Sequence, residues 1–125
     1  MALNKKLMKE CKSKLLECKA DLLNRVQDTK QGLYSDEKGG DEGDQTMRAL
    51  AEAEMLQMAD RLRRQLMEIE YALARIDNGN YGVCEETDEL IEIDRLKAIP
   101  WTRLSIEGAE IRESIVKRRA MGGRR

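Results

Sequence analysis

The chain has 125 residues, of which 38% are charged and only 3% aromatic, with no Phe, no His and a single Trp. So few large rings cannot fill a thick core, and the apolar side chains are therefore expected to form a narrow seam between helices. The absence of His removes the commonest general base and the commonest zinc ligand, which argues against an enzyme. No apolar run is long enough to cross a membrane, so we expect a cytoplasmic protein.

An apolar stripe at the start of the chain predicts one long helix, from about residue 3 to residue 32. Lysine and glutamate occupy the other face of this helix, which would be about 45 Å long at the standard helical rise. The members of the stripe recur at steps of three or four residues: Leu3, Leu7, Cys11, Leu15, Cys18, Leu22 and Val26.

Residues 35–45 interrupt this pattern with glycines and carboxylates, which predicts an exposed acidic turn. Five acidic residues stand against one lysine between Ser35 and Thr46. Such a turn would repel nucleic acid and attract cations or basic protein surfaces. For Asp44 the alternative to a functional role is that of an N-cap for the next helix, and for Asp41 it is that of a solvated loop charge.

A second stripe predicts another long helix, from about residue 46 to residue 76. Neither helix can bury its stripe alone, so the two are predicted to pair as an antiparallel hairpin, a coiled coil over residues 1–78 with its acidic tip at 35–45. The second stripe repeats every 3.6 residues on average: Met47, Ala51, Met55, Met58, Leu62, Leu66, Ile69, Leu73 and Ile76.

Residues 79–121 have a different character and predict a small globular head. The segment Asp77-Asn-Gly-Asn80 is typical of a helix end. The alternation in Glu89–Asp94 suggests a short strand, and a last helix is expected from about Leu104 to Met121, followed by a flexible tail at 122–125. The residues predicted to form the small core of the head are Leu90, Ile91, Ile93, Leu96, Ile99, Trp101, Leu104 and Ile106.

Three motifs in the second half of the chain resemble the signature of the DksA/TraR family. They are Gly79-Asn-Tyr-Gly-Val-Cys84, Glu89-Leu-Ile91 and Arg95-Leu-Lys-Ala-Ile-Pro100, and Asp41-Glu-Gly-Asp44 is similar to the acidic pair at that family's coiled-coil tip. The resemblance implies a mainly α fold, with a long helical hairpin, a zinc-finger-like head and a C-terminal helix. It also implies a bacterial transcription regulator that inserts its coiled coil into the secondary channel of RNA polymerase.

The chain departs from the family at the zinc site. Of the four cysteines that hold zinc in the family, only Cys84 is present, and the other three positions read Thr87, Ser105 and Gly108. Hydroxyl groups are poor zinc ligands and glycine offers none, so we expect a degenerate finger without zinc, in which Cys84 is a buried small side chain. The positions that bind the alarmone ppGpp in some members appear as Glu68, Ile99 and Ala109, so we also expect no ppGpp site.

By the same resemblance, Asp41 and Asp44 are expected to lie near the catalytic Mg²⁺ of the polymerase. Thr46 stands where the family has a small Ala or Ser, and its extra bulk is expected to affect activity rather than binding. Arg61 is expected to contact a rim helix of the polymerase. A monomer with RNA polymerase as its partner is predicted, without catalysis of its own.

Two other kinds of function stay open from the sequence. Charge-rich helical hairpins are common, so the chain is alternatively a structural or adaptor coiled coil with a different protein partner. The basic groups in Lys117-Arg-Arg119 and Arg124-Arg125 have no aromatic neighbours. Basic residues in the last turn also complement the helix dipole, so direct sequence-specific binding of nucleic acid is not expected.

Overall fold

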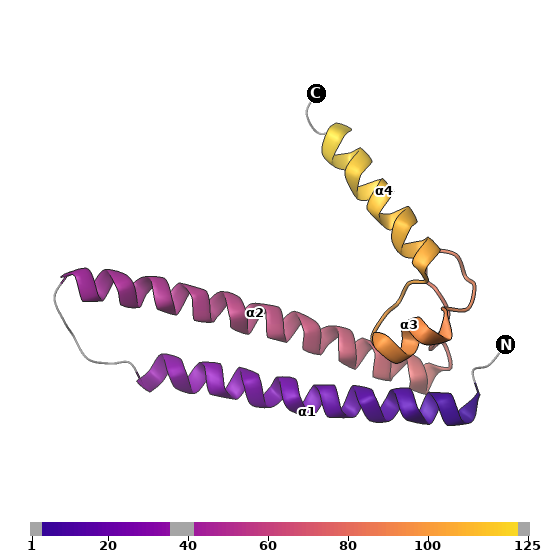
Figure 1. Cartoon of the computed structure of the whole chain (residues 1–125), viewed down its shortest axis with the longest axis horizontal. Coiled ribbons are helices and arrows are strands. Elements are labelled where there is room, and N and C mark those ends of the chain that lie inside the picture. The colour runs from indigo at the N-terminus through magenta and orange to yellow at the C-terminus, as the bar shows by residue number, and fades with distance from the viewer. Residues whose placement is uncertain (1–3, 36–41, 123–125) are drawn as a thin grey trace. The chain divides into compact units, whose positions relative to one another are not determined.

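The computed structural model describes residues 4–35 and 42–122, which form four helices (Figure 1). Helix α1 covers Lys5–Ser35, α2 covers Glu42–Asn78, α3 covers Ile93–Ala98 and α4 covers Ile106–Gly122. The chain divides into two compact units, one of residues 16–70 and one of residues 1–15 together with 71–125. Within the described ranges, no helix has the length and apolar character that a membrane span needs.

In the unit of residues 16–70, α1 and α2 lie side by side and run in opposite directions (Figure 1). Leu22 of α1 and Leu62 and Ile69 of α2 are almost fully buried. Because the described part of this unit contains no other element, these side chains are buried between the two helices. An ion pair of 3.8 Å between Lys19 and Glu70 also joins them. The predicted antiparallel hairpin is confirmed.

The second apolar stripe is buried only in part. Met47 and Met58 are 72% and 45% exposed, so the prediction that they belong to the seam is wrong. At 100° per residue both positions lie on the same face as the buried Ile69, so the helical period alone did not reveal their exposure. Ala59, which the sequence pattern did not include, is only 2% exposed. Ala59 therefore belongs to the buried face of α2.

Both long helices extend further toward the tip than predicted. Helix α2 begins at Glu42, so Asp44 lies inside its first turn and is not the N-cap. Acidic residues are favoured in a first turn because they face the positive end of the helix dipole, and this explains the earlier start. Asp41 and most of the predicted turn lie outside the described residues.

In the other unit, the beginning of α1 and the end of α2 support the head. Leu7, Cys11 and Leu15 of α1 are buried, which confirms the first apolar stripe in this region. The ammonium group of Lys14 donates a hydrogen bond of 3.0 Å to the carbonyl of Lys97 in α3. The beginning of α1, up to residue 15, is thus bound to the head by packing and by a hydrogen bond.

Helix α2 ends as the sequence predicted. Gly79 adopts a left-handed conformation with φ +82°, its N–H donates to the carbonyl of Ile76, and that of Asn80 donates to the carbonyl of Arg75. This pair of bonds is the Schellman motif, which satisfies carbonyls at the helix end and reverses the chain. The reversal directs residues 80–84 back along α2.

The head has a smaller core than predicted and, in its described residues, no extended strand. Ile91 and Leu96 are almost fully buried, whereas Leu90 and Ile93 are 39% and 52% exposed. The predicted strand at 89–94 is wrong, because only an isolated bridge joins Leu90 to Val83 and the next residues begin α3. The alternation of apolar and polar residues in this segment reflects a single buried residue, Ile91, between exposed neighbours, and not a strand of a sheet.

Tyr81 is a central part of the head that the predicted core did not include. Its ring is 3% exposed, and its hydroxyl donates a hydrogen bond of 2.8 Å to the carbonyl of Pro100. Burial raises the pKa of the phenol, and the neighbouring Cys11 thiol raises it further. The group therefore stays neutral and ties the start of the head to the segment after α3.

Candidate functional site

The residues predicted to act on a polymerase lie along α2. Asp44 and Thr46 are exposed near its beginning, and Arg61 is exposed further along the same helix. Arg61 is about 25 Å from Asp44 at the standard rise, so no single small-molecule site could contain both residues. They are suited to two separate contacts with a large partner.

The four positions that correspond to the family's zinc ligands are close together in the head. Cys84 is fully buried in the turn that follows α2, and Ser105 and Gly108 are buried at the beginning of α4. The hydroxyl of Ser105 donates a hydrogen bond of 3.4 Å to the sulfur of Cys84. The fold thus brings the four positions close to one another. The groups that they supply are a thiol, two hydroxyls and a glycine.

Ser105 has a structural role that sequence reasoning missed. Its side-chain oxygen accepts a hydrogen bond of 3.0 Å from the N–H of Gly108, which makes it the N-cap of α4. The same hydroxyl gives its proton to Cys84. The signal was present in the sequence, because serine directly before a helical segment is a common N-cap.

The sulfur of Cys84 lies among hydrogen-bond donors. Burial by itself raises the pKa of a thiol, but hydrogen bonds from the hydroxyls of Ser105 and Thr87, and from their backbones, outweigh it and lower the pKa of Cys84 to about 6. The surroundings of the Cys84 sulfur are therefore polar, because the hydroxyl protons of Ser105 and Thr87 are directed at it.

Gly108 is required by the close approach of α4 to Cys84. A Cβ atom at this position would lie 2.4 Å from the sulfur of Cys84 and 3.3 Å from the Cβ of Glu86. Because the cysteine side chain is short and fully buried, it cannot move aside without displacing its neighbours. Any side chain at position 108 therefore forces α4 and the turn apart.

We expect Gly108→Ala to lower the free energy of unfolding by roughly 1–3 kcal/mol, as overpacking of a core does. Gly122→Ala is the matched control, since no atom lies within 4 Å of the added Cβ and the position is at the end of the same helix. Adding Cys84→Ala to Gly108→Ala should recover part of the loss, because the overlap is removed. Urea unfolding of the wild type and the three variants measures these free energies. Equal stability of the two single glycine variants would contradict the close approach of α4 to Cys84.

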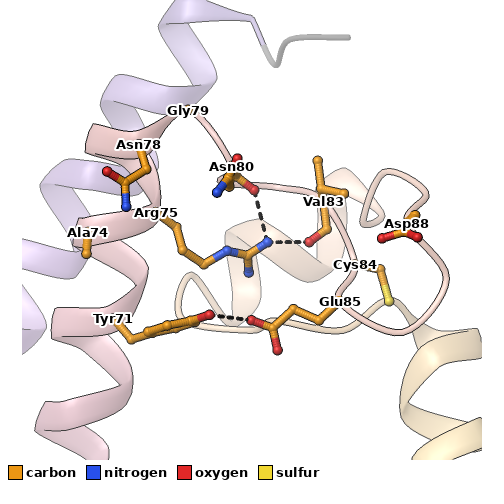
Figure 2. Close-up of a pocket in the computed structure, with 10 residues that line it drawn as sticks. All are labelled: Tyr71, Ala74, Arg75, Asn78, Gly79, Asn80, Val83, Cys84, Glu85 and Asp88. Carbon is orange, nitrogen blue, oxygen red and sulfur yellow. Dashed lines mark hydrogen bonds between the residues drawn. The ribbon is translucent and has the colours of Figure 1, made fainter.

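A pocket of about 460 Å³ lies beside the turn that follows α2 (Figure 2). Arg75 is 7% exposed, and one nitrogen of its guanidinium donates to the carbonyls of Asn80, at 2.9 Å, and Val83. The hydroxyl of Tyr71 donates a hydrogen bond of 2.7 Å to the carboxylate of Glu85. The guanidinium of Arg103 lies over the Tyr71 ring, 4.1 Å from its centre. These contacts hold the turn against α2.

No pattern in the sequence predicted this role for Arg75 or Tyr71. Both residues lie on α2, where a charged or polar side chain is normally solvated. Their hydrogen-bond partners belong to the loop after α2, which the Schellman motif directs back toward the helix. Such contacts depend on the tertiary path of the chain. The ten residues that line the pocket are Tyr71, Ala74, Arg75, Asn78, Gly79, Asn80, Val83, Cys84, Glu85 and Asp88.

Comparison with known proteins identifies the family. Residues 79–114 match the model of the prokaryotic dksA/traR C4-type zinc finger. The chain is 34% identical over 112 residues to the RNA polymerase-binding transcription factor DksA of Caulobacter vibrioides, a match that covers 89% of this chain and 79% of that protein. The chain belongs to the DksA/TraR family.

Solved structures of DksA-type proteins have the same fold. The chain is similar to transcription factor DksA2 from Pseudomonas aeruginosa, with a TM-score of 0.84 and 29% identity over 91% of this chain and 88% of that one. It also resembles in fold an RNA polymerase binding protein and transcriptional regulator from Chlamydia trachomatis, with a TM-score of 0.57, 22% identity, and coverage of 93% and 98%. The predicted fold class, a helical hairpin with a zinc-finger region, is confirmed.

The family match contradicts our expectation that the protein takes no cofactor. Residues 79–114 belong to a zinc-finger family described as C4-type, so the prediction that zinc is absent is wrong on this comparison. That prediction rested on the side chains at four positions, whereas the match covers the whole segment and its fold.

The donor set of this chain nevertheless does not fit a four-cysteine site. Cys84 is the one thiol of the four positions, and a side chain at Gly108 would overlap its sulfur. Among the described residues, no group of three or more Cys, Asp or Glu side chains is placed to hold a metal ion.

Proposed function

We propose that this protein binds RNA polymerase and regulates transcription by placing the tip of its helical hairpin in the secondary channel. The observation that carries the proposal is the 34% identity to an RNA polymerase-binding transcription factor, which extends over 89% of the chain and includes both the hairpin and the head. The partner is thus a protein assembly, and the chain acts in the cytoplasm as a monomer without catalysis of its own.

The arrangement of the hairpin supports this mode of action. A pair of antiparallel helices is long and narrow, and it needs no wide surface to enter a channel. Carboxylates at the tip are hard oxygen ligands and strong hydrogen-bond acceptors, so Asp41 and Asp44 are suited to a position near the catalytic Mg²⁺ and basic elements of the polymerase. There they would alter the stability of promoter complexes rather than carry out a reaction.

Thr46 is one residue that would tune this action. It is exposed in the first turns of α2, two positions beyond Asp44. Its β-branched side chain adds bulk close to the acidic pair, where the family has Ala or Ser. The bulk would act at the active centre and leave the affinity, which depends on the sides of the hairpin, largely unchanged.

Direct binding of the full chain to purified RNA polymerase tests the proposal. Saturable binding is expected, and Arg61→Ala should weaken it roughly 3- to 10-fold, as loss of one exposed charged contact does. Arg63→Ala is the matched control, because Arg63 lies on nearly the opposite side of α2 and pairs with Asp60 at 3.7 Å. Failure of the wild-type chain to bind would favour a coiled-coil adaptor for another protein, and equal loss in both variants would remove the role of Arg61.

A further inference from the structure

A groove of about 600 Å³ lies where the first turns of α1 meet the end of α2. Its floor is apolar, formed by the half-buried side chains of Met8 and Ile76. Four exposed lysines surround the floor, and we call this surface the lysine groove. These lysines are Lys5, Lys6, Lys9 and Lys12.

None of the four lysines makes an ion pair in the part of the chain that the structure describes. Elsewhere in the same unit, Arg112 pairs with both Glu85 and Glu86. Four cations within eight residues repel one another, and Glu10, the acidic residue among them, makes no ion pair with any of them among the residues that the structure describes.

The position of these lysines at the beginning of a helix makes the arrangement more unfavourable. Asn4 caps α1, because its side-chain oxygen accepts a hydrogen bond of 3.0 Å from the N–H of Lys6. The first turn of α1 contains no acidic residue. Cations at this end oppose the positive pole of the helix dipole, so the local sequence lowers helix stability without a local benefit. Such violations of local preference are typical of functional surfaces.

We propose that the lysine groove binds an acidic segment of RNA polymerase that carries apolar side chains among its carboxylates. This inference rests on the proposed function and adds to the hairpin a second contact, made by the other unit. The unpaired ammonium groups supply charge complementarity to carboxylates, and Met8 and Ile76 supply a floor for one or two apolar side chains.

Two other anionic partners fit the surface less well. Single-stranded nucleic acid is normally bound by stacking on aromatic rings, and no aromatic residue lines the groove. An anionic membrane would need protruding apolar side chains to insert into it, but Met8 and Ile76 are half-buried at the floor. The geometry therefore favours a protein segment.

The test replaces three of the lysines, in the variant Lys5→Gln/Lys9→Gln/Lys12→Gln, and measures the Kd for purified RNA polymerase. Glutamine keeps the length and the helix propensity, so the variant should fold, as circular dichroism would verify. The Kd should rise roughly 3- to 30-fold at low salt, and the difference should shrink as salt screens the charges. The control Lys117→Gln/Arg118→Gln/Arg119→Gln removes the same number of charges from α4 and should keep the wild-type Kd.

The outcomes separate this inference from the proposed function. If wild type fails to bind the polymerase, the proposed function is wrong. If wild type binds and the lysine variant binds equally well, or if both triple variants lose affinity equally, the lysine groove is not the contact. Single-stranded RNA and phosphatidylserine vesicles serve as further probes. Binding of either probe that is lost only in the lysine variant, with polymerase binding unchanged, would assign the groove to that partner instead.

Discussion

Asp41→Asn/Asp44→Asn is expected to abolish the effect of this protein on transcription by purified RNA polymerase while leaving most of the binding intact. Asparagine has nearly the size of aspartate but no charge, so the carboxylates near the active centre are lost without a change of shape. A loss of at least about 10-fold in the regulatory effect is expected, as for removal of a charged contact at a desolvated site. A promoter assay with saturating protein measures it.

The matched control is Glu52→Gln/Glu54→Gln, which removes two exposed carboxylates from α2 beyond the tip. This control should regulate as the wild type does. Circular dichroism of the tip variant should show an intact hairpin, because Asp44 lies in the first turn of α2 and its replacement leaves the seam of the hairpin untouched. If the tip variant and the wild type change transcription equally, the acidic pair is a solvated turn without a role at the active centre.

Leu96→Ala is expected to lower the free energy of unfolding by about 2–5 kcal/mol, which is a large fraction of the stability of a small domain. Leu96 is fully buried in α3, so the truncation leaves a cavity among closely packed neighbours. Chemical unfolding followed by the fluorescence of Trp101, the one tryptophan of the chain, reports on this part of the molecule.

Leu90→Ala is the control for this prediction, because it removes the same atoms from a side chain that is 39% exposed. Its effect should stay below about 1 kcal/mol, as the truncated surface is partly in water already. The sequence assigned both leucines to the core of the head, and similar losses in the two variants would contradict the different roles that their burial predicts.

The sequence by itself determined the two long helices and their antiparallel pairing. The stripe of Leu7, Cys11 and Leu15 repeats with the helical period. The charged residues between them occupy the other side of the helix and leave one apolar face, which must be buried. The glycine at position 79 marked the end of α2, because few other residues adopt its left-handed conformation. Periodicity and backbone preferences are local properties, so a single sequence carries them.

Only the tertiary structure decided which apolar residues are buried and what surrounds the functional positions. Met47 and Ala59 differ in size and hydrophobicity, yet the small one is buried and the large one exposed, because helix contact depends on how closely two backbones approach. The bonds of Arg75 to the carbonyls of Asn80 and Val83 likewise exist because the chain reverses after α2.

The head shows the same division at the candidate ligand positions. The sequence revealed that Thr87, Ser105 and Gly108 replace cysteines of the family pattern, but not that Ser105 both caps α4 and donates its proton to Cys84. It also could not reveal that Gly108 leaves no room for a side chain. The cap is a local feature, but the contacts of Ser105 and Gly108 with Cys84 depend on distances between segments about twenty residues apart, which folding sets through packing and which no local pattern encodes.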